Sequence, residues 1–135
     1  MAEYILKDKV KKLGIADKFD ISSAGTSSEE VGNPIYPPAK AVLEKHGITD
    51  LKNHKAKQIK LSDYSNADII FAMDFHNMRN LMRISGNDPQ NKLKMFIPDE
   101  IEDPWYTNNF EKVYNMINNG CEKFLNDYLL KNKIN

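Results

Sequence analysis

The alternation of helical and strand-like segments is the feature that most constrains how this chain can fold. Four segments carry apolar residues at helical spacing: 2–13, 39–46, 76–84 and about 110–130. Two others, 67–73 and 92–97, are short and rich in apolar residues, as strands are. A third, 18–23, is a short segment that contains Phe19 and Ile21 and runs into the breaker Gly25. Because strands separated by helices usually pair in parallel with helices on both faces, the sequence predicts a three-layer α/β fold.

Length and composition support a single folded domain over residues 1–135. Hydrophobic residues make up 41% of the chain and charged residues 28%, which excludes low-complexity and strongly disordered classes. The 19 basic residues balance the 19 acidic ones, so we expect no binding to nucleic acid or to an anionic membrane. We expect a cytoplasmic protein, since one cysteine cannot form an intrachain disulfide and no apolar stretch is long enough to span a membrane.

The cysteine and the histidines give little sign of chemistry. Cys121 lies on the apolar stripe of the last predicted helix, where a buried small side chain is the expected role rather than a nucleophile. His46, His54 and His76 lack the close spacing of metal ligands. The sequence therefore predicts no metal and no cofactor.

The segment Asp103-Pro104-Trp105-Tyr106 is the sharpest candidate for function. It ends an acidic stretch, 99–103, which is either a cation site or, more commonly, a solvated turn. Pro104 restricts the backbone of Asp103, and neighbouring aromatic rings raise the pKa of a carboxyl group by desolvation, as a general acid requires. The alternative is a structural loop anchored by Trp105.

Taken together, the motifs resemble those of the low-molecular-weight protein tyrosine phosphatases over about 120 residues. Each match is weak alone, but all occur in the family's order. They are Met1-Ala2-Glu3, Ser23-Ala24-Gly25-Thr26, Gly32-x-Pro34 with Ala39, Leu43 and Gly47-Ile48, His54-x-Ala56-x-Gln58, Ala67-Asp68-Ile69-Ile70 with Ala72-Met73-Asp74 and Asn77, Asp103-Pro104-Trp105-Tyr106, and Phe110-Glu111-x-Val113-Tyr114 with Gly120-Cys121.

The resemblance implies a role for each matching site residue. Asp103 corresponds to the general acid, which protonates the tyrosyl leaving group and later activates water. Trp105 and Tyr106 correspond to residues that line the phosphotyrosine slot. Ser23 and His54 correspond to residues that brace the phosphate loop. The substrate implied is a phosphotyrosine protein or a small aryl phosphate.

One family element does not occur in these 135 residues. It is a strand followed by C-x-x-G-N-x-C-R-S-P, which supplies the nucleophilic cysteine, the phosphate-binding arginine and a nest of backbone N–H groups. Cys121 is followed six residues later by Asp127, and the only arginines are Arg79 and Arg83. We therefore expect the chain to be N-terminally truncated relative to the family and inactive as given.

The resemblance to the family also predicts the number of strands in the sheet. The family has four parallel strands in the order 2-1-3-4, so loss of the central first strand predicts three strands here. Unpaired strands beside the gap are costly, so we expect the sheet to close, to be completed by a partner, or to rearrange.

Two other functions are also compatible with the sequence. The chain is alternatively a non-catalytic remnant that binds or regulates a partner through a sheet edge, with homodimerisation as one form of that binding. A relationship to arsenate reductases is less favoured, because those proteins usually need additional cysteines in the middle of the chain, where this sequence has none.

Overall fold

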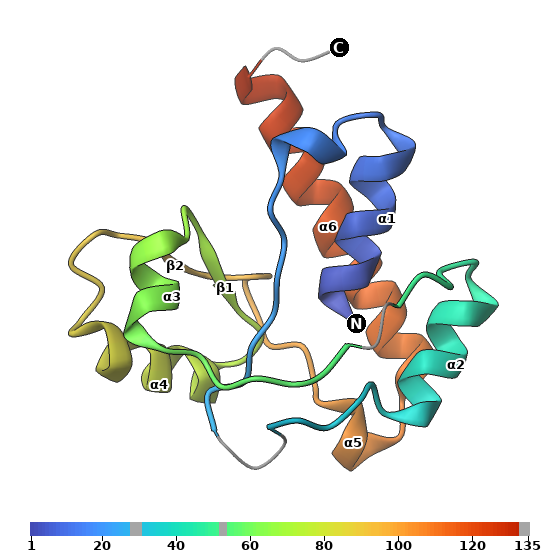
Figure 1. Ribbon diagram of the computed structural model, residues 1–135, viewed down its shortest axis with the longest axis horizontal. Coiled ribbons are helices and arrows are strands. Elements are labelled where there is room, and N and C mark those ends of the chain that lie inside the picture. Colours follow the sequence, from blue (N-terminus) through green and yellow to red (C-terminus); the bar gives the residue numbers. More distant parts are fainter. Residues whose placement is uncertain (28–30, 52–53, 133–135) are drawn as a thin grey trace. The chain divides into compact units, whose positions relative to one another are not determined.

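The computed structural model describes residues 1–27, 31–51 and 54–132 (Figure 1). The chain divides into two compact units. The first contains Met1–Ser23, Ile35–His54 and Pro104–Asn135, and the second contains Ala24–Pro34 and Lys55–Asp103. Within the described residues, no helix is both long and apolar enough to cross a membrane.

The first unit is helical. It contains α1 (Ala2–Lys12), a short 3-10 turn η1 (Ala16–Lys18), α2 (Pro37–Lys45), α5 (Pro104–Thr107) and α6 (Phe110–Asn132). Both α1 and α2 pack against the long helix α6 (Figure 1). The largest fully buried side chains of this unit are Ile5, Val10, Leu43, Val113 and Cys121. Burial of each aliphatic side chain contributes about 1.5–3 kcal/mol, so these contacts hold α1 and α2 on α6.

The ends of α2 follow from its sequence. Pro37 occupies the first turn, where its missing N–H breaks no helical hydrogen bond. At the other end Gly47 has a φ of +83°, and the N–H of Ile48 donates to the carbonyl of Leu43 at 2.9 Å. This pattern ends a helix most easily at glycine, which accepts the left-handed conformation without strain. The predicted helix is confirmed.

The second unit contains the sheet. Its elements are α3 (Leu61–Asn66), β1 (Ile70–Ala72), α4 (Phe75–Ser85) and β2 (Leu93–Met95). The two strands are parallel, with Ile70 opposite Leu93, and α4 packs against both. Their apolar core is built from Tyr64, Ala72, Leu81 and Leu93.

The start of α4 explains one of the sequence motifs. Asp74 directly follows β1 and caps the helix, since its Oδ1 accepts a hydrogen bond from the N–H of Asn77 at 2.7 Å. The carboxylate of Glu100 accepts a second one, from the N–H of Phe75 at 2.8 Å. The Met73-Asp74 turn is thus fixed because free N–H groups at a helix start need acceptors.

The prediction of three strands is wrong for the described residues, whose sheet has two. Residues 18–23 begin in η1 and form no strand. The apolar side chains of Phe19 and Ile21 instead pack on a cluster of Val10, Ile15 and Leu125. Their alternation therefore reflects contact with helices rather than with a sheet. The parallel pairing of the other two strands is confirmed, whereas the missing first strand and the single domain stay predictions.

Candidate functional site

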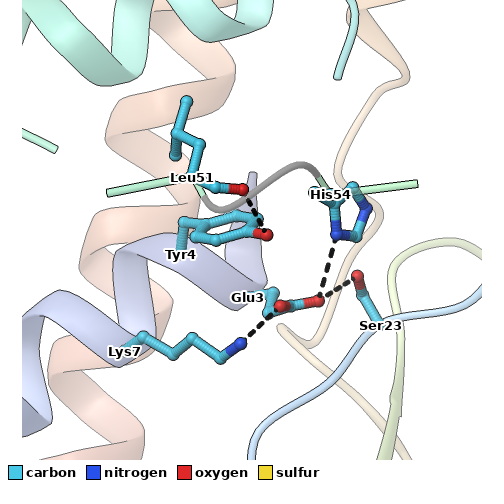
Figure 2. A network of polar contacts seen from close by, with 6 residues as sticks. All are labelled: Glu3, Tyr4, Lys7, Ser23, Leu51 and His54. Carbon is cyan, nitrogen blue, oxygen red and sulfur yellow. Dashed lines mark hydrogen bonds and ion pairs between the residues drawn. The ribbon is translucent and has the colours of Figure 1, made fainter. Parts of the chain in front are cut away.

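A buried carboxylate joins the two residues that were predicted to brace the phosphate loop. Glu3, in the first turn of α1, is 8% exposed. Its Oε1 accepts a hydrogen bond from Ser23 Oγ at 2.6 Å and lies 3.9 Å from His54 Nδ1 (Figure 2). Its Oε2 forms an ion pair with Lys7 Nζ at 2.6 Å, one helical turn further along α1. Ser23 and His54 are thus brought together through Glu3.

The electrostatics of this cluster favour a charged carboxylate. Burial acts to raise the pKa of Glu3, but hydrogen bonds from Lys7 and Ser23, and the charges of Lys7 and His54, outweigh it. The pKa of Glu3 therefore lies below its ordinary value. The helix dipole acts in the same direction, since a negative charge is stabilised in the first turn of a helix.

Tyr4 fixes the other side of the cluster. Its hydroxyl donates to the carbonyl of Leu51 at 3.0 Å, and its ring meets the imidazole of His54 edge to face, with 5.4 Å between centroids. The backbone N–H of His54 also donates to the carbonyl of Leu51, at 3.1 Å. Residues 3 and 4 of α1 thus hold both the polar edge and the ring of His54 (Figure 2).

Two of the sequence motifs are paired by backbone hydrogen bonds within the second unit. The backbone N–H of Gly25 donates to the carbonyl of Lys57 at 2.8 Å, and the carbonyl of Gly25 accepts from the backbone N–H of Ile59 at 2.8 Å. The backbone N–H of Gly32 donates to the carbonyl of Ala56 at 2.7 Å. The segments that begin at Gly25 and at Lys55 therefore support each other, although they are distant in the sequence.

The Asp-Pro-Trp-Tyr segment is partly helical. The sequence predicts a loop here, but Pro104 begins the four-residue helix α5, because proline is well suited to the first position of a helix. Trp105 is 55% exposed and Tyr106 is 80% exposed. The ring of Trp105 lies 4.4 Å from that of Tyr36, measured between centroids. The roles predicted for Asp103, Trp105 and Tyr106 stay predictions.

Cys121 is packed in the core of the first unit. Its side chain is 1% exposed, and burial raises the pKa of the thiol to about 11. A thiol with that pKa is protonated at neutral pH and is a poor nucleophile. The interpretation of Cys121 as a buried small side chain is confirmed.

The sequence pattern missed Glu3 as a site residue. A signal was present, because an acidic residue in a first helical turn followed four positions later by lysine predicts an ion pair. Its bond to Ser23 depends on tertiary structure, which spacing does not reveal. In the described ranges, no three histidine, cysteine or acidic side chains lie close enough to bind a metal ion together. The absence of a metal or cofactor in the protein stays a prediction.

Comparisons with known proteins identify the family. The sequence profile of the low molecular weight phosphotyrosine protein phosphatases matches residues 1–134. The chain is 33% identical over 132 residues to the low molecular weight protein-tyrosine-phosphatase YfkJ of Bacillus subtilis, covering 93% of this chain and 84% of that protein. It is 36% identical over 135 residues to the phosphatase of Gallus gallus, with the same two coverages.

Solved structures of the same family are also similar to this chain. The crystal structure of YfkJ matches with a TM-score of 0.89 at 32% identity, over 98% of this chain and 86% of that one. The Streptococcus pyogenes enzyme SP-PTP matches with a TM-score of 0.86 at 33% identity, over 93% and 81%. The chain therefore belongs to the low molecular weight phosphotyrosine protein phosphatase family.

Proposed function

We propose that these 135 residues supply the proton donor and the aromatic wall of a phosphotyrosine phosphatase site, but do not hydrolyse phosphotyrosine by themselves. The state of Cys121 carries this proposal. It is the only cysteine in the sequence, and it is buried as a neutral thiol with Asp127 rather than arginine six residues later. A C-x5-R cradle cannot form around it.

The reaction of the family divides into steps that need different groups. A thiolate attacks phosphorus to give a cysteinyl phosphate, while a carboxylic acid protonates the departing tyrosyl oxygen. The same group, now a carboxylate, then takes a proton from the water that releases phosphate. In this proposal Asp103 performs both proton transfers, and Trp105 and Tyr106 contact the aryl ring.

In this proposal the remaining site residues do not react with substrate but hold Ser23 and His54 in place. Glu3 is charged and accepts a hydrogen bond from Ser23, so Ser23 is held in one orientation. The ring of His54 is held by Tyr4. We infer that this cluster keeps both braces fixed where the family places its phosphate loop. Because phosphate is stabilised by fixed N–H groups, any looseness there reduces the rate.

The experiment adds the family element that does not occur in these 135 residues. The strand and C-x5-R loop of a family member are joined to Met1, and p-nitrophenyl phosphate hydrolysis by the purified protein is measured. We expect turnover, and we expect Asp103→Asn to lower kcat by about 10²–10⁴-fold, the usual contribution of a general acid. Asp99→Asn is the matched control, since it removes the same charge from the same acidic stretch and should leave kcat unchanged. Equal rates for both variants would overturn the assignment of Asp103.

A further inference from the structure

Tyr36 contacts the tryptophan that the proposed function places against substrate. The centroids of the Tyr36 and Trp105 rings are 4.4 Å apart, with 56° between the ring planes. Tyr36 also stacks on Phe110, with 5.8 Å between the ring centroids and 30° between the ring planes. Phe110 is 8% exposed and begins α6, so it is anchored in the core of the first unit. Trp105 is thereby linked through Tyr36 to a fixed helix.

The backbone of Tyr36 is unusually restricted. It lies in the sequence Pro34-Ile35-Tyr36-Pro37-Pro38 and is the residue before α2, with φ of −58° and ψ of 130°. A residue before proline is confined to extended conformations. Its carbonyl also accepts the N–H of Lys40 at 3.0 Å. Tyr36 can therefore hold a neighbouring ring without losing much conformational entropy itself.

Trp105 needs such a support. It belongs to α5, which has only four residues, and helices this short are not stable on their own. The ring of Tyr36 lies against that of Trp105.

We infer that Tyr36 is a positioning residue for aryl substrates: it orients the indole of Trp105 so that this ring receives the aromatic ring of phosphotyrosine. The inference rests on the proposed function, because it assumes that Trp105 contacts substrate. Tyr36 acts through its ring and not its hydroxyl, so phenylalanine should replace it and leucine should not.

Trp105 is the only tryptophan in the sequence, which gives a specific signal. The indole N–H resonance is followed by NMR in the isotope-labelled protein that carries a tryptophan-free family strand and loop before Met1, with the loop cysteine changed to serine so that the ester is not hydrolysed. It is titrated with phosphotyrosine, and with phosphoserine as the control without a ring; this protein with Tyr36 intact serves as wild type. We expect a saturable shift with phosphotyrosine only. Tyr36→Leu should raise the Kd for phosphotyrosine by about two- to tenfold, the usual effect of losing one aromatic pair. The Kd of Tyr36→Phe should stay within about twofold of the wild-type value.

The outcomes separate the two claims. If wild type shows no phosphotyrosine-dependent shift, the assignment of Trp105 in the proposed function fails, and the role of Tyr36 fails with it. If wild type binds but Tyr36→Leu has the same Kd, only the role of Tyr36 is overturned. Should Tyr36→Leu not fold, nuclear Overhauser contacts between the two rings in wild type decide, since their absence contradicts the orientation on which the inference depends.

Discussion

Replacing Glu3 by glutamine removes one negative charge at nearly constant volume. The lost interactions are a partly buried hydrogen bond from Ser23 and an ion pair with Lys7, both at 2.6 Å. A hydrogen bond to a charged group contributes about 1.5–3 kcal/mol. The lysine is 44% exposed, so solvent reduces its ion pair to about 0.5 kcal/mol. Because glutamine keeps one acceptor oxygen, we expect a loss of about 2 kcal/mol in the free energy of unfolding at neutral pH.

The pH dependence gives a second readout of the same variant. The pKa of Glu3 is lower in the folded state than its ordinary value of 4.5. Its contribution is therefore fully present above pH 4.5 and is lost as the pH falls through the folded-state pKa. The stability of wild type should decline over this acidic range, and Glu3→Gln should show a smaller decline because it has no charge there to lose.

Urea unfolding followed by circular dichroism measures both effects. The control is Glu122→Gln, which removes an ion pair with Lys9 at 3.1 Å from a carboxylate side chain that is 56% exposed. We expect this control to change the free energy of unfolding by less than about 0.5 kcal/mol. If Glu3→Gln at neutral pH is no more destabilising than Glu122→Gln, the reasoning about the buried carboxylate is refuted.

Two further predictions concern Cys121 and Asp74. Burial raises the pKa of Cys121 from 9.0 to about 11, so the free energy of unfolding should fall between these pH values by up to about 2.7 kcal/mol. This fall, measured by urea titration, should be smaller in Cys121→Ala, and a fall of equal size would contradict the shift. Asp74→Ala removes the N-cap of α4 and should cost about 1 kcal/mol by the same measurement, whereas Asp74→Asn, which still caps, should cost less. Equal losses for the two Asp74 variants would show that the cap is unimportant.

Local signals in the sequence were sufficient for most helices. Pro37 and Gly47 mark the two ends of α2 because proline and glycine have fixed conformational preferences, independent of tertiary contacts. The single apolar stripe of residues 110–130 similarly predicted α6 and the burial of Cys121. The family resemblance added the prediction that Ser23 and His54 brace the phosphate loop.

Tertiary structure decided what the sequence did not. A run such as residues 18–23 has the alternation of a strand, but that pattern describes only which side chains are buried, and helices can bury them as well as a sheet. The contact of Tyr36 with Trp105 and the bond between Ser23 and Glu3 join segments that are far apart in the chain. Propensity carries no information about such pairs.

The most direct test of the central claim is the rate at which the purified 135-residue chain releases inorganic phosphate from phosphotyrosine. The proposed division of the site predicts a rate equal to that of buffer, for wild type and for Cys121→Ala alike, because the buried thiol takes no part. A rate above buffer that Asp103→Asn abolishes would contradict the account, since these residues would then cleave the ester without the family's nucleophile.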